Sequence, residues 1–143
     1  MSTKQIHVFI SHSWAYSDHY DRLSEWIFKE NWRRGQASLD FRDFSVPEND
    51  PIHNANNDLQ LKNAIYDKIS RSHVVIIPTG MYTHRSKWIK KEIEGAKEFR
   101  KPILAVNPHG QERKAGVVLD KADELVGWNK QPLIDAIWKL YNQ

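Results

Sequence analysis

The run His73-Val74-Val75-Ile76-Ile77-Pro78 constrains the fold of this chain more than any other stretch. Its apolar residues are continuous and β-branched, which favours a strand over a helix. A strand that is apolar on both faces must be covered on both faces, and such strands are typical of parallel sheets flanked by helices. The chain is therefore predicted to form a layered α/β structure around this strand.

Shorter strand-like and helical patterns alternate on either side of this run. Four further strands are expected, at residues 6–11, 38–44, 102–106 and 124–127. Amphipathic helical patterns lie between most of these strands and after the last one. We predict one domain, residues 1–143, with a flavodoxin-like three-layer sandwich and a five-stranded parallel sheet of order 2-1-3-4-5.

The N-terminal half also contains signals for the ends of the first helix and for a long loop. The first helix is predicted to begin after Ser17, a favourable N-cap residue, and to end at Gly35, a common residue after helix ends. After the second strand, residues 45–57 contain two prolines and four asparagines, which predicts a long irregular loop. Loops of this length are uncommon in compact domains and are often functional.

Composition excludes several classes of function. The chain has 143 residues, no cysteine and a net charge of +3, so disulfides, thiolate metal sites and cysteine nucleophiles are excluded. Lysine and arginine are spread along the chain, so no nucleic-acid partner is expected. No apolar run approaches a membrane span, and the N-terminus lacks the pattern of a signal peptide. We expect a cytoplasmic protein without a membrane partner.

Residues 86–96 have the pattern of an amphipathic helix with a chemically distinctive side. Ile89, Ile93 and Ala96 are spaced for one core-facing stripe. Trp88 and Glu92 are four residues apart, so they stack on the side next to that stripe. The pattern predicts a carboxylate at the edge of the core, positioned and partly desolvated. The structural alternative is a surface glutamate beside a packing tryptophan.

Polar segments follow the predicted strands at the edge where ligands of such sheets bind. Ser11, His12 and Ser13 follow the first strand, and Asp43 and Phe44 end the second. The carboxyl ends of parallel strands share one edge, so these segments and the start of the Trp88 helix should open on it. For His12 a turn satisfied by local hydrogen bonds is an equal alternative, and for Phe44 anchoring of the loop is the favoured one.

Several motifs, in this order and spacing, resemble those of TIR domains. Phe9-Ile10-Ser11-His12-Ser13 is similar to the opening strand of a TIR domain, and residues 44–51 lie where TIR domains carry their BB loop. Trp88 followed by Glu92 resembles the W-x-x-x-E signature of NAD-consuming TIR domains. Val126-Gly127-Trp128-Asn129 resembles the TIR-like branch that includes ThsB of the bacterial Thoeris anti-phage system.

The resemblance implies that NAD+ is a substrate, and no cofactor or metal is expected. The bond between nicotinamide and ribose would break through an oxocarbenium-like transition state, which a carboxylate can stabilise. By resemblance Glu92 is the catalytic residue and Trp88 packs against the substrate. In the Thoeris branch the ADP-ribose fragment becomes a signal nucleotide, cyclic or conjugated, that activates a separate effector. A homo-oligomer is compatible with the family, whose members often complete their sites between copies.

One departure from the family concerns the first motif. Many TIR domains have a basic residue after its aromatic position, whereas this chain has His12-Ser13-Trp14. We expect His12, Ser13 and nearby backbone N–H groups to bind the pyrophosphate instead, because turns and helix N-termini suit anions. Ser11, Asp43, Phe44 and Trp88 complete the predicted substrate-binding set.

Two other functions remain open from the sequence. One is a non-catalytic TIR-like module that signals by assembly, and the other is a glycosyl transferase of the nucleoside deoxyribosyltransferase type, with glutamate as nucleophile. A phosphorelay receiver is disfavoured, because the first and third strands end in Ser11-His12-Ser13 and Pro78-Thr79-Gly80 without the required aspartates. P-loop, Rossmann and hydrolase-elbow motifs are absent from the sequence.

Overall fold

The computed structural model describes residues 2–11, 18–45, 58–79, 86–107, 118 and 121–143. At residues 58, 61 and 86–88 it describes the backbone alone. The strands are β1 Ser2–Ile10, β2 Trp32–Arg34, β3 Ala37–Asp43, β4 Val74–Pro78, β5 Ile103–Val106 and β6 Glu124–Val126. The labelled helices are α1 Asp18–Phe28, α2 Asp58–Ser70, α3 Ser86–Glu98 and α5 Lys130–Tyr141. None of the helices in these residues combines the length and apolar character needed to cross a bilayer.

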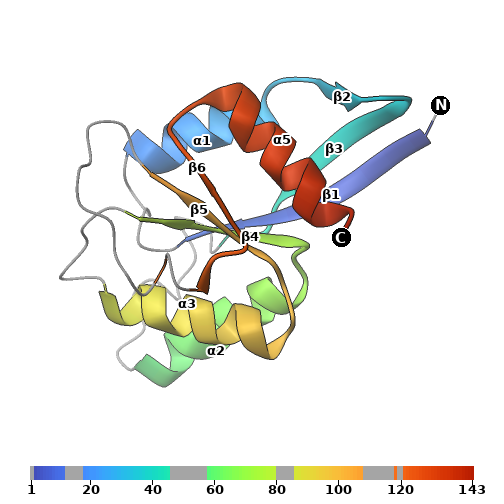
Figure 1. Ribbon diagram of the computed structural model, residues 1–143. Coiled ribbons are helices and arrows are strands. Elements are labelled where there is room, and N and C mark those ends of the chain that lie inside the picture. The colour runs from blue at the N-terminus through green and yellow to red at the C-terminus, as the bar shows by residue number, and fades with distance from the viewer. Residues whose placement is uncertain (1, 12–17, 46–57, 80–85, 108–117, 119–120) are drawn as a thin grey trace.

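The strands form one mostly parallel sheet of order β2-β3-β1-β4-β5-β6 (Figure 1). Every neighbouring pair from β3 to β6 is parallel. β2 runs antiparallel to β3 at one edge of the sheet. Numbered among themselves along the chain, the five parallel strands have the predicted order 2-1-3-4-5. The α/β, flavodoxin-like prediction is therefore confirmed, and the predicted number of strands is corrected from five to six.

The additional strand, β2, lies where the first helix was predicted to continue. α1 ends at Phe28, seven residues before Gly35, and Trp32 pairs with Leu39 across the β2–β3 hairpin. Gly35 has a φ of 59° and lies in the turn that joins β2 to β3. It therefore forms part of a hairpin turn and does not end the helix. The Trp32 side chain is buried, and its Nε1–H donates a 2.7 Å hydrogen bond to the Trp26 carbonyl oxygen. Burial of this one large side chain holds the short strand in place.

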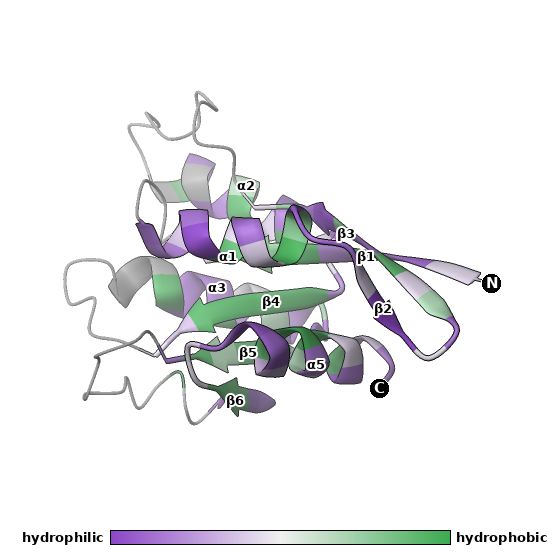
Figure 2. Cartoon of the chain, turned by 90° about the horizontal axis from the view of Figure 1, so that it is seen from above, coloured by the Kyte–Doolittle hydropathy of each residue, from purple (hydrophilic) through white to green (hydrophobic). Residues whose placement is uncertain are grey.

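Two hydrophobic cores lie on opposite faces of the sheet. In Figure 1, α1 and α5 cover one face while α2 and α3 cover the other. Val74 and Ile76 of β4 pack into the first core, and Val75 and Ile77 pack into the second. Figure 2 shows β4 and β5 as hydrophobic strands between these helices. The prediction that this run is covered on both faces is thus confirmed for residues 74–78, which are all buried, while His73 before the strand is partly exposed.

Candidate active site

The carboxyl ends of the parallel strands carry most of the buried polar side chains. Ser11 follows β1, Ser45 follows β3 and Thr79 follows β4, and all three are buried. Glu92 of α3 is 0 % exposed. Among the residues that the structure describes, Ser72 is the other buried polar residue, and it precedes β4 at the opposite end. The polar interior of the described structure is therefore concentrated at the edge where ligands of this fold bind.

Glu92 and Ser11 form the centre of this edge. Ser11 Oγ donates a 2.6 Å hydrogen bond to Glu92 Oε1. Ile89 and Ile93, on the same helix, are buried in the core beneath α3, as the spacing predicts. Glu92 was expected at the edge of the core and partly desolvated. The structure instead buries it completely.

A carboxylate removed from water is costly unless hydrogen bonds or charges compensate. The short bond from Ser11 supplies such compensation, since hydrogen bonds to charged oxygens are about twice as strong as neutral ones. The Ser11 backbone is itself anchored, because its N–H donates a 2.9 Å hydrogen bond to the Ile76 carbonyl oxygen of β4. The position of Glu92 Oε1 is therefore tied to two central strands of the sheet.

A second set of hydrogen bonds joins the end of β3 to the same strand. Ser45 Oγ accepts a 2.9 Å hydrogen bond from the Ile10 N–H, one residue before Ser11. The Ser45 N–H donates to Asp43 Oδ1 at 2.9 Å, and the Tyr20 hydroxyl of α1 donates to Asp43 Oδ2. Asp43 thus links α1, the end of β3 and, through Ser45, the end of β1.

The chemistry of Tyr20 follows from this arrangement. Its pKa is raised above the ordinary value, first by burial and then by the hydrogen bond and negative charge of Asp43. Ser45 has a smaller, opposite effect on the pKa. Tyr20 therefore stays protonated near neutral pH and acts as a permanent donor to Asp43.

On the other side of the edge, Thr79 and Asn107 follow β4 and β5. Thr79 Oγ1 donates to Asn107 Oδ1 at 3.1 Å, and the Thr79 N–H donates to the Val106 carbonyl oxygen at 3.0 Å. The Asn107 N–H in turn donates to the Val126 carbonyl oxygen of β6 at 2.9 Å. These bonds continue the polar edge from Ser11 toward β6.

Phe44 lies against the face of the sheet. Its ring stacks on His7 of β1, with centroids 4.1 Å apart and planes at 13°. The Phe44 N–H extends the β3 pairing by donating to the Val8 carbonyl oxygen at 2.9 Å. Both contacts hold the chain where it leaves β3, as the anchoring alternative describes.

Comparison with protein families adds an independent finding. The model of the family described as "Thoeris protein ThsB, TIR-like domain" matches residues 9–113, well over half of the chain. This chain belongs to the ThsB TIR-like family. The matched segment includes Ser11, Asp43 and Glu92, so the described edge of the sheet lies within the family region.

Other comparisons are less informative about this ThsB-type chain. Among solved structures, the pilus assembly protein CpaE from Caulobacter crescentus CB15 is similar over 96% of this chain and 91% of that chain. The identity is 13% and the TM-score is 0.41, at which the similarity carries no argument. No curated protein matches the sequence at a significant level.

The predicted site residues of this ThsB-type domain separate into three groups. Ser11 and Glu92 are in direct contact, and Asp43 is connected to the residue before Ser11 through Ser45. Phe44 contacts His7 instead of these groups. The third group lies outside what is described: His12, Ser13 and the side chain of Trp88, whose backbone is in α3.

Four residues of the polar edge were not singled out from the sequence: Tyr20, Ser45, Thr79 and Asn107. Thr79 and Asn107 directly follow apolar strands, and that position is a signal that could have identified them. Ser45 and Tyr20 gave no comparable signal. A serine that begins a loop and a tyrosine on a helical stripe are common, and only their contacts with Ile10 and Asp43 distinguish them.

Proposed function

We propose that this ThsB-type protein is an enzyme that cleaves NAD+ at the bond between nicotinamide and ribose. Its product would be an ADP-ribose-derived, cyclic signal nucleotide that activates a separate effector in anti-phage defence. The observation that supports this proposal best is the buried Glu92 carboxylate, held by Ser11 at the carboxyl edge of the sheet. Membership of the ThsB TIR-like family supports the same reading.

The proposed chemistry needs little beyond a well-placed carboxylate. When the C1′–N bond of NAD+ breaks, its electron pair leaves with nicotinamide, which becomes neutral, and the ribose becomes oxocarbenium-like. A negative charge beside the ribose stabilises this developing positive charge. Nicotinamide leaves without a proton, so one carboxylate suffices where many glycosidases need two. A hydroxyl of the same molecule then attacks C1′ and releases its proton, or an adenine ring nitrogen attacks with its lone pair and the amino group of the same ring system releases the proton. Either attack closes a cyclic product.

In this proposal Glu92 carries the charge and Ser11 orients it. The Ser11 hydroxyl fixes Oε1 at 2.6 Å, which removes rotational freedom that the carboxylate would otherwise lose on reaction. Ser11, His12, Ser13, Asp43, Phe44 and Trp88 are the proposed substrate-binding residues. Assembly of several copies around NAD+ is compatible with the proposal.

The test is nicotinamide release from NAD+ by wild-type protein and by Glu92→Gln, with the products separated by mass. Each protein is assayed with and without lysate from phage-infected cells. Glutamine keeps the shape of the side chain and can still accept a hydrogen bond from Ser11. Glu94→Gln is the matched control, because Glu94 is on the same helix but exposed. Glu92→Gln should reduce release by about 100-fold or more, while Glu94→Gln should leave it unchanged.

The other outcomes point to different functions. Equal release by wild type and Glu92→Gln would remove Glu92 from the mechanism. No release by wild type under either condition would contradict NAD+ cleavage and favour a module that signals by assembly. Release of nucleobase from nucleosides, but not of nicotinamide from NAD+, would favour a nucleoside glycosyl transferase.

A further inference from the structure

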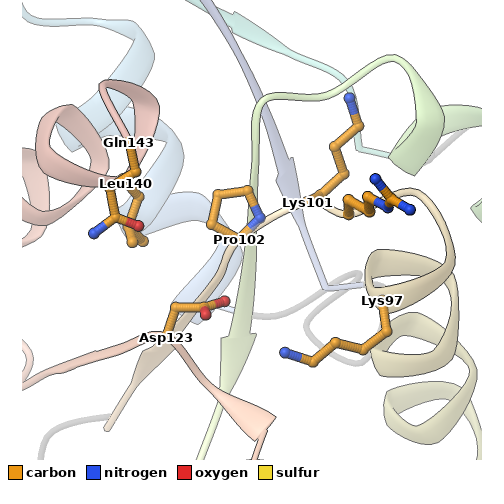
Figure 3. Close-up of a pocket in the computed structure, with 7 residues that line it drawn as sticks. Lys97, Lys101, Pro102, Asp123, Leu140 and Gln143 are labelled. Atoms are coloured by element: carbon orange, nitrogen blue, oxygen red, sulfur yellow. The ribbon is translucent and has the colours of Figure 1, made fainter.

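A pocket lies at the end of the molecule opposite Glu92. Its volume is about 390 Å³, within the range of small-molecule sites. It is formed where α3 leads into β5, where β6 begins and where α5 ends. Figure 3 shows Pro102 between the end of α5, with Leu140 and Gln143, and the end of α3, with Lys97. The pocket is therefore separate from the edge that carries Ser11 and Glu92.

Positive charge dominates the lining of this pocket. Lys97, Arg100 and Lys101 contribute cations, and Asp123 contributes the carboxylate. None of the three cations forms an ion pair with any residue in the described part of the chain. In Figure 3 the ammonium group of Lys97 points toward the side of the pocket that holds Asp123. The lining is therefore suited to a ligand with more than one negative charge.

The Asp123 carboxylate is already engaged by the backbone. Its Oδ2 accepts a 2.8 Å hydrogen bond from the Ile103 N–H, and the Asp123 N–H donates to the Ile103 carbonyl oxygen at 2.8 Å. These two bonds fix the start of β6 against β5. Asp123 consequently has a structural role and offsets the three cations only in part.

Cations near a helix C-terminus often satisfy its last carbonyl groups. Here the backbone closes the end of α3. The Lys101 N–H donates to the Ala96 carbonyl oxygen at 2.8 Å, and the Arg100 N–H donates to the Lys97 carbonyl oxygen at 3.2 Å. Arg100 occupies this turn with a φ of 57°, where glycine or asparagine is usual. Capping of the α3 C-terminus by side chains therefore does not explain why three cations gather here. It also does not explain why Arg100 occupies a position with positive φ that usually holds glycine.

We propose that this pocket binds a nucleoside diphosphate. The guanidinium group of Arg100 and the ammonium group of Lys97 would bind the two phosphate groups, since such cations pair strongly with phosphate oxygens. The ammonium group of Lys101 points away from Lys97 and Asp123 in Figure 3, so it would add positive charge at longer range. Pro102 lines the pocket and is partly exposed, so it can contact the nucleoside part, whereas Leu140 is 2 % exposed and adds little surface. Binding at this pocket would not depend on the substrate or the chemistry of the Glu92 edge.

The test is a titration of the ¹⁵N-labelled full chain with ADP and, separately, with pyrophosphate, followed by NMR. Both should cause saturable shifts of amides in residues 97–103, near Asp123 and near Gln143. ADP should bind more tightly, because its nucleoside contacts Pro102. Arg100→Gly is the decisive variant, since glycine is relaxed at this φ and should not impair folding. It should weaken ADP binding by about tenfold or more, as loss of a charge-assisted contact predicts.

Lys90→Gln is the control, because Lys90 is an exposed cation on the same helix outside the pocket. It should leave the affinity unchanged. Affinity should also fall with added salt, because the contacts are electrostatic. The proposal is overturned if neither compound shifts the pocket amides saturably, if shifts occur only near Ser11 and Glu92, or if Arg100→Gly binds ADP as wild type does. Tighter binding of pyrophosphate than of ADP would overturn the nucleoside part.

Discussion

Ser11 Oγ donates a 2.6 Å hydrogen bond to Glu92 Oε1 across 81 residues of sequence, and both side chains are buried. This pair joins the end of the first strand to the middle of α3. Because both side chains are buried, removal of either partner takes a hydrogen bond from a polar group that water cannot reach to replace it. Stability and the proposed activity should therefore both depend on it.

Ser11→Ala should lower the free energy of unfolding by about 1–3 kcal/mol, the cost of removing a partner from a buried polar group. The proposed nicotinamide release should fall as well, because Glu92 loses its orienting contact. Urea unfolding of Ser11→Ala, Glu92→Gln and the double variant measures their coupling. Ser70→Ala is the control, since its hydroxyl bonds the Asp67 carbonyl oxygen at an exposed position. Because glutamine can still accept a neutral hydrogen bond, additive effects of Ser11→Ala and Glu92→Gln would contradict a charge-assisted bond between Ser11 and Glu92.

Asp43→Asn should lower the pKa of Tyr20. The Asp43 charge and hydrogen bond help to raise that pKa, so a neutral amide leaves burial as the main cause. Ultraviolet titration of the wild type and Asp43→Asn, each with and without Tyr20→Phe, isolates this tyrosine. Tyr66 is an internal control, because its raised pKa comes from burial and from Glu94 and Glu98. An unchanged Tyr20 transition in Asp43→Asn would contradict the assignment.

His73 should make the protein less stable in mild acid. Burial and then His7 and Lys101 lower the pKa of His73, and its Nδ1 accepts a 2.9 Å hydrogen bond from the His7 N–H. The unfolded chain therefore binds a proton more readily than the native protein. This contribution is fully present above the unfolded pKa of about 6.5 and is lost as the pH falls below it.

The measurement for His73 is urea unfolding between neutral and mildly acidic pH. His73→Asn should flatten the pH dependence, because its amide oxygen can accept the same hydrogen bond but does not titrate. An unaltered pH dependence in His73→Asn would show that other groups are responsible.

Gly95→Ala should destabilise the protein, although alanine favours helices. A Cβ at Gly95 would lie 3.0 Å from Tyr66 Cδ1 and Cε1 and 3.3 Å from Ile69 Cδ1, where α3 meets α2. The propensity gain of up to about 1 kcal/mol should be outweighed by overpacking of about 1–3 kcal/mol. In a Tyr66→Ala background the same change should stabilise. Thermal unfolding of the four proteins checks this reversal, and destabilisation in both backgrounds would contradict it.

Much of the fold was predictable because periodicity reports burial directly. The apolar run at residues 73–78 became β4, covered on both faces, and the spacing of Ile89 and Ile93 placed α3 on the sheet. The short strand β2 was not predicted. Three residues are too few for a periodic signal, and the strand exists because it pairs with β3 and buries Trp32.

The sequence by itself determined the order of the five parallel strands, the family and the helical face that carries Glu92. These follow from local patterns and from motifs within short segments. The tertiary structure alone decided that Glu92 is fully buried, that Ser11 is its partner, and that Tyr20 and Ser45 connect to Asp43. Such contacts join residues far apart in the chain, and they depend on how closely a helix lies on the sheet. Short-range periodicity carries no information about that distance.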